Sequence, residues 1–135
     1  MVPESDRSDG LEDPGRPEDA REPPTQQEVR DEIAREIVRI HEESYGRGAA
    51  SAEAMVAEGW VIVILDDLEL LPNEKVLVEK GKEDTVLQVR AQYQQAIRSS
   101  FSAAIERATG RTVVGFASTT SLEEPRFMVE IFRLE

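Results

Sequence analysis

The stretch WVIVIL, residues 60–65, is apolar at every position. A strand with one face in water alternates apolar and polar side chains, so an unbroken apolar run indicates a strand that is covered on both faces. The run Ala52–Ala57 precedes it, and only Glu58 and Gly59 separate the two runs. Short runs joined by a tight turn that ends in glycine predict a β-hairpin.

An amphipathic helix is predicted before the hairpin. Thr25 and Glu28 form a T-x-x-E capping box, which is a start signal for a helix. Apolar residues at three- and four-residue spacing then continue to about Tyr45. Gly46 follows at the position where a left-handed helix cap is expected.

More helix and two further strands are predicted after the hairpin. Residues 73–80 can form a short helix before Gly81, and apolar spacing predicts one long helix over residues 83–109. The stretches RTVVGFAS (111–118) and RFMVEIFRL (126–134) are predicted strands. The expected fold class is α+β, helix-hairpin-helix-hairpin (α-β-β-α-β-β), with a four-stranded sheet and helices packed on one face.

Residues 1–25 differ from the rest of the chain in composition. They hold five of the seven prolines, and eight acidic residues against three arginines. Such a segment buries too little apolar surface to offset the entropy of ordering it. We therefore expect a disordered, acidic, proline-rich tail before a domain at residues 26–135, and not a signal peptide, which would need an apolar core.

Charge and composition exclude several classes of partner. The net charge is −12, which opposes binding to nucleic acid and to anionic lipid. The chain has no cysteine, so disulfides and zinc–cysteine sites are excluded. Its longest apolar run is the six residues 60–65, whereas a membrane helix needs about twenty. A cytoplasmic protein without direct membrane insertion is expected.

The apolar strands also predict an interface. Two principal helices can cover one face of the sheet, yet residues 60–65 and 127–132 are apolar on both faces except at Glu130. An apolar face left in water usually marks an interface, and a symmetric dimer is the commonest way to cover it. We therefore expect a homodimer, unless the short helix at 73–80 folds over that face. The candidate interface residues are Trp60, Ile62, Val63, Ile64, Met128 and Phe132.

The segment YGRG, Tyr45–Gly48, supports two interpretations. A glycine-rich turn can bind an anion, and an arginine adds a planar set of donors. These glycines, however, follow a helix C-terminus, which is the negative end of the helix dipole, so a simple helix stop is favoured. Arg47 could still reach a partner. The candidate anion or partner contacts are Gly46, Arg47, Gly48 and Arg111.

No set of residues predicts catalysis. His41 is the only histidine and lies beside the apolar stripe of its helix, where packing or capping is the favoured role. Asp66, Asp67 and Glu69 lack the spacing of a calcium loop. No serine stands in a G-x-S-x-G motif. We expect a protein that is not an enzyme and holds neither metal nor cofactor.

The order of three short motifs resembles the MpsC-like domain family, over about residues 26–135. The motifs are Gly46-Arg47-Gly48, the LPNEK of residues 71–75, and TGRTVVGF at residues 109–116. Two features depart from the family pattern, namely Ala49, where proline is common, and the acidic tail.

The resemblance implies a role but no reaction. It suggests a small accessory or regulatory protein of a sodium-translocating, membrane-potential-generating system that concerns inorganic carbon uptake. Other, larger subunits carry out the transport, and the family offers no catalytic residues to transfer. A membrane transport subunit is then a possible partner. The alternative hypothesis is a small-anion or nucleotide sensor that uses Arg47 and Arg111.

Overall fold

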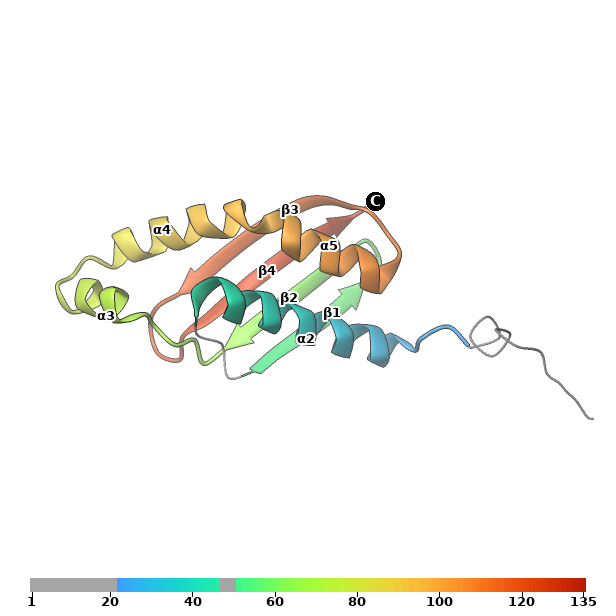
Figure 1. Ribbon diagram of the computed structural model, residues 1–135, viewed down its shortest axis with the longest axis horizontal. Helices are drawn as coiled ribbons and strands as arrows, with labels where there is room; N and C mark the ends of the chain where they lie inside the picture. Colours follow the sequence, from blue (N-terminus) through green and yellow to red (C-terminus); the bar gives the residue numbers. More distant parts are fainter. Residues whose placement is uncertain (1–21, 47–50) are drawn as a thin grey trace, which may run out of the picture.

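The computed structural model describes residues 22–46 and 51–135. Most of the predicted tail lies outside these ranges, as do Arg47 and Gly48. The helices are α2 (Gln26–Tyr45), α3 (Pro72–Glu79), α4 (Glu83–Ala96) and α5 (Arg98–Thr109). The strands are β1 (Ser51–Ala57), β2 (Trp60–Asp66), β3 (Val113–Ser121) and β4 (Phe127–Leu134). The α+β fold class is confirmed (Figure 1).

Helix α2 begins and ends where its sequence signals predict. The Glu28 backbone N–H donates to Thr25 Oγ1 at 3.1 Å, and the Thr25 N–H donates to Glu28 Oε1 at 2.8 Å. Both bonds satisfy donors that a helix start would otherwise leave free. At the other end Gly46 has φ 72°, a left-handed conformation that glycine adopts without strain.

The long helix predicted over residues 83–109 is two helices. The break falls at Ile97, which has φ −103° and ψ 9°, between α4 and α5. No glycine or proline marks it. The reason is packing, because α5 lies beside α2 across the sheet while α4 continues toward α3 (Figure 1). One straight helix could not follow both directions.

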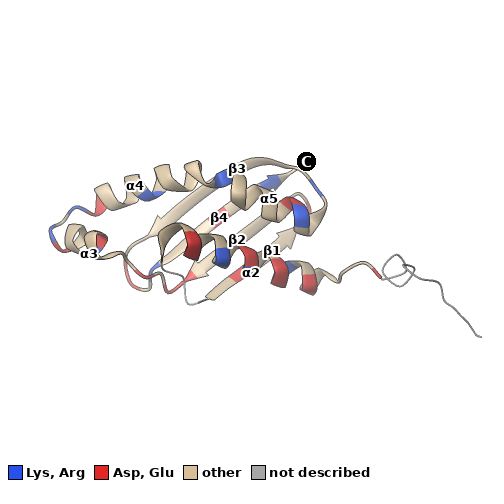
Figure 2. Cartoon of the chain, viewed as in Figure 1, with Lys and Arg blue, Asp and Glu red and all other residues tan. Residues whose placement is uncertain are grey.

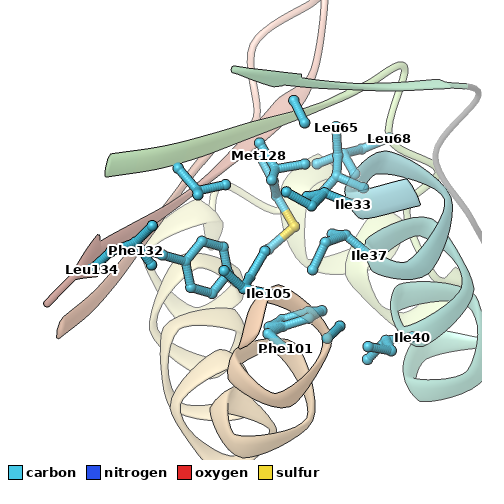
Figure 3. Close-up of a cluster of buried hydrophobic side chains, with 14 residues drawn as sticks. Ile33, Ile37, Ile40, Leu65, Leu68, Phe101, Ile105, Met128, Phe132 and Leu134 are labelled. Atoms are coloured by element: carbon cyan, nitrogen blue, oxygen red, sulfur yellow. The ribbon is translucent and has the colours of Figure 1, made fainter. Parts of the chain in front are cut away.

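The sheet has the order β1-β2-β4-β3, and all neighbouring strands are antiparallel. Helices α2, α4 and α5 lie on the same face of it, and α3 lies beyond the ends of the strands, beside α4 (Figure 1). Ile33 and Ile37 of α2 and Phe101 and Ile105 of α5 point into one cluster with side chains of β2 and β4 (Figure 3). The short helix α3 packs against α4 on this same side. The expectation that it might cover the second face is therefore wrong.

Candidate functional site

The burial of strand β2 alternates even though its sequence does not. Val61, Val63 and Leu65 are 0% exposed beneath the helices. Ile62 and Ile64 point the other way and are only half-buried, and Trp60 is 43% exposed. The helices of the described residues therefore cover one face of β2 and leave its other face uncovered.

We call the uncovered side the open face. The apolar side chains of its central patch come from β1, β2 and β4 and include Met55, Trp60, Ile62, Ile64, Val129 and Ile131. Met55, Ile62 and Ile131 lie opposite one another across the three strands, and Ile64 lies opposite Val129. Directly opposed side chains in a sheet are about 5 Å apart. The open face is therefore a continuous apolar patch.

One edge of the open face carries an arginine on a tryptophan. The guanidinium carbon of Arg133 lies 4.6 Å from the centre of the Trp60 ring, a cation–π contact. Arg133 Nη1 also donates to the Gly59 carbonyl at 3.3 Å. The turn that joins β1 to β2 thus holds this pair in place.

Three of the six predicted interface residues lie on the open face, namely Trp60, Ile62 and Ile64. The other three are wrongly placed, because Val63, Met128 and Phe132 are 0% exposed in the core of the domain. Successive side chains of a strand point to opposite faces, so Val63 cannot share a surface with Ile62. That the open face binds a partner remains a prediction.

A buried ion pair lies on the helix side of the sheet. Arg90 of α4 is 1% exposed, and its Nε and Nη2 donate to the two carboxylate oxygens of Glu74 at 2.7 and 2.8 Å. The Leu71 backbone N–H donates to the same carboxylate at 2.8 Å. Burial opposes ionisation, but these donors outweigh it and hold the pKa of Glu74 below its usual value.

Glu130 of β4 is the second buried carboxyl group, with 0% of its surface exposed. The side-chain nitrogen of Gln94 donates to the two carboxylate oxygens of Glu130, at 2.9 and 3.2 Å. The side-chain oxygen of Gln94 accepts from the Tyr45 hydroxyl at 2.8 Å. The partners of Glu130, Gln94 and Ser118, are neutral, and their hydrogen bonds offset only part of the cost of removing its charge from water. Burial therefore raises the pKa of Glu130 to about 7.

Two of the sequence motifs meet beside this polar cluster. Tyr45, the first residue of YGRG, has its ring 4.6 Å from the Arg90 guanidinium, and Glu74 belongs to LPNEK. Both contribute to a pocket of about 300 Å³ whose other walls are mainly apolar. Since the charges of Glu74 and Arg90 cancel, the pocket offers no net charge to an anion. Packing accounts for Tyr45 and Glu74, the residues of the two motifs that meet here.

The structure does not bring the predicted anion contacts together. Gly46 follows the last turn of α2, whereas Arg111 lies with Gln26 and Val29 beside its first turns. A helix of 20 residues is about 30 Å long, so these sites are at opposite ends of the domain. Arg111 Nη2 donates to the Glu135 carbonyl at 2.8 Å. Arg47 and Gly48 are outside the described residues.

The other candidate residues occupy ordinary positions. His41 is 1% exposed, and its ring centre is 4.6 Å from that of Tyr45. In residues 22–46 and 51–135, no three histidine, aspartate or glutamate side chains gather in a way that would hold a metal ion. Nor is any helix of those residues long and apolar enough to cross a membrane.

Comparison with known proteins places the domain in a family. The family model described as "Na+-translocating membrane potential-generating system (MpsC)" matches residues 25–135. No curated protein and no solved structure matches the chain. The matched region begins at the N-cap of α2 and includes every helix and strand described above. The chain belongs to the MpsC family.

Proposed function

We propose that this protein is a non-catalytic accessory component of a membrane transport or membrane-energisation system. It acts through protein–protein contact, and the open face is its association surface. The family description links the chain to a sodium-translocating system. The observation that carries the mode of action is the open face itself, an apolar patch across three strands that no described helix covers.

The composition of the open face supports association. Interfaces between proteins have an apolar centre with charged groups kept to the rim. Here the centre is formed by Ile62, Ile64, Val129 and Ile131. The cation–π pair of Trp60 and Arg133 lies at the edge. Tryptophan and arginine are also the residue types that contribute most to binding.

The buried titratable groups support a structural role for the helix side. Glu74 is engaged by Arg90, and Glu130 by Gln94. These contacts join α3, α4 and β4 to one another. The polar groups of this side therefore hold the domain together, and they leave the open face as the surface for contact.

Complementation tests the proposal in cells. A strain that lacks this protein is given the wild-type chain, Ile62→Glu or Val76→Glu, and its membrane potential is followed with a voltage-sensitive dye. Val76 is the matched control, because it is 54% exposed on α3, away from the open face. We expect the wild type and Val76→Glu to restore the membrane potential and Ile62→Glu to fail. Equal restoration by both variants would exclude the open face as the working surface.

A further inference from the structure

We infer that the open face is covered by a second copy of this chain, in a two-fold dimer whose axis passes over Ile62. The inference rests on the proposed function, because it names the occupant of the same surface. It is carried by the positions of Glu53 and Arg133, two of the three charged residues that the strands place on the open face; the third, Asp66, lies at the end of β2.

Glu53 and Arg133 lie symmetrically about Ile62. Ile62 of β2 lies opposite Met55 of β1. Glu53 is two residues from Met55 on β1 and lies opposite Ile64. On its other side, Ile62 lies opposite Ile131 of β4. Arg133 is two residues from Ile131 on β4 and lies opposite Trp60, so it is displaced along the strands in the direction opposite to Glu53. Neighbouring strands are about 4.8 Å apart, and alternate residues of one strand are about 6.8 Å apart. Glu53 and Arg133 are therefore each roughly 8 Å from Ile62, and they lie on opposite sides of it.

This arrangement is complementary to itself. Two identical surfaces meet about a two-fold axis, so each contact between different positions occurs twice. An axis through Ile62, at right angles to the line from Glu53 to Arg133, exchanges those two positions. Glu53 of each copy then meets Arg133 of the other. The strands of the two sheets cross steeply in this arrangement, close to the orthogonal class of sheet packing.

The centre of the contact would be free of charge, as association between acidic chains requires. Each chain has a net charge of −12, so two copies repel one another at long range. The apolar residues nearest the axis include Ile62, Met55, Ile131 and Val129. Their burial supplies the attraction, and the two Glu53–Arg133 pairs set the orientation.

The flat area of the open face falls somewhat short of an ordinary interface. Four strands of about seven residues span roughly 19 Å by 24 Å. Two such faces bring together about 900 Å² of flat area. Specific interfaces bury about 1,200–2,000 Å² in total. The side chains that project from both faces have to supply the difference.

Sedimentation equilibrium on the full chain tests the inference. We expect a wild-type dimer, a folded monomer for Ile62→Glu, and a dimer for the matched control Val76→Glu, with far-UV circular dichroism confirming that each variant folds. A wild-type monomer at ~100 µM would overturn the inference. So would a dimer that Ile62→Glu leaves intact. A monomer that still needs Ile62 in the complementation assay would leave the proposed function standing with another occupant.

A charge exchange tests the position of the axis. We expect Glu53→Arg and Arg133→Glu each to weaken the dimer by about tenfold, because each places like charges together twice. The double variant restores both pairs with their signs reversed, so it should recover most of that loss. Glu58→Arg, at the exposed turn beside β1, is the control and should not weaken the dimer. Failure of the double variant to recover would exclude this axis.

Discussion

The two faces of the sheet are built from similar residues and differ in what lies over them. Val63 is fully buried beneath the helices, and its neighbour Ile62 is half-buried on the open face. The covered face contains a carboxyl group, Glu130, with a partner provided by α4. The open face keeps its charges, Glu53, Asp66 and Arg133, away from its centre. One face is arranged as a core, and we propose that the other is an interface.

The charge distribution of the domain follows the same division. The helices and loops carry most of the coloured charged residues, while the strands are mostly uncharged (Figure 2). Many charges on the helices remain in water or pair with neighbours on the same helix, as Arg39 does with Glu36 and Glu43. The buried pair of Arg90 and Glu74 joins two helices instead. A sheet that bears so few charges has one face for the core and another that is suited to a partner.

The largest difference is expected between two variants that each add a charge, at adjacent residues on opposite faces of the sheet. Val63→Glu places a carboxylate in the core directly opposite Glu130, and an unpaired buried charge is among the costliest changes known. We expect a loss of more than about 4 kcal/mol, enough to unfold the domain. Ile62→Glu adds its charge on the open face, where water reaches it, and should cost about 1 kcal/mol or less in the monomer.

Urea unfolding followed by far-UV circular dichroism measures both variants. The protein is kept below the concentration at which it dimerises, so that each measurement reports the monomer. Similar losses for Val63→Glu and Ile62→Glu would mean that both faces are covered within the chain. That result would remove the contrast between the two faces.

Local signals in the sequence account for much of the fold. The capping box at Thr25, the cap at Gly46 and the turn at Glu58-Gly59 act within a few residues, and the structure confirms each. The final strands are likewise confirmed, because their apolar pattern is short and bounded. Signals of this kind need no knowledge of the rest of the chain.

Other features depend on distant partners and could not be predicted. The apolar spacing that predicts a helix over residues 83–109 includes Val89 and Tyr93, yet they are 57% and 38% exposed. Arg90 and Gln94 are buried instead, in phase with Val86, because Glu74 and Glu130 pair with them from elsewhere in the chain. The sequence did offer one signal, because Arg90 and Gln94 follow Val86 at four-residue spacing and so lie on the same side of the helix.

The open face illustrates the same limit. An apolar run in WVIVIL shows that both sides of β2 need cover, but it does not say which cover comes from within the chain. The helices provide it for Val61, Val63 and Leu65 only. The assignment of Val63, Met128 and Phe132 to the interface failed because the helix-covered face was not known.

A smaller effect is expected from the buried ion pair. Arg90→Met removes the partner of Glu74 and leaves its carboxylate buried with one backbone donor. We expect a loss of about 3–4 kcal/mol in the free energy of unfolding, measured in urea at neutral pH. The double variant Arg90→Met, Glu74→Met should recover much of it, since an apolar pair of similar volume often replaces a buried ion pair at little cost.

The control for this prediction is an ion pair in water. Arg39→Met breaks the contacts of Arg39 with Glu36 and Glu43, which are exposed to solvent, and should change stability little. If Arg90→Met were as mild as Arg39→Met, the polar cluster would be a surface feature and not part of the core. The covered face would then lose its distinguishing property.

The smallest expected effect depends on pH and arises from Glu130. Its pKa is about 7 in the folded domain, against an ordinary value of 4.5. Between these two pH values the folded state holds a proton that the unfolded state has lost. Stability should therefore fall as the pH rises from about 4.5 to about 7 and then level off. A shift of this size corresponds to about 3 kcal/mol.

Glu130→Gln removes this ionisation and keeps a side chain of similar shape. The wild type and the variant should have similar stability near pH 4.5, and the variant should be the more stable by about 3 kcal/mol above pH 7. Urea unfolding across this range gives the difference, and Glu58→Gln, at the exposed turn between β1 and β2, is the control. A difference between Glu130→Gln and wild type that stays constant with pH would mean that Glu130 ionises as freely as in water. The covered face would then admit solvent at its centre, and burial would no longer distinguish it from the open face.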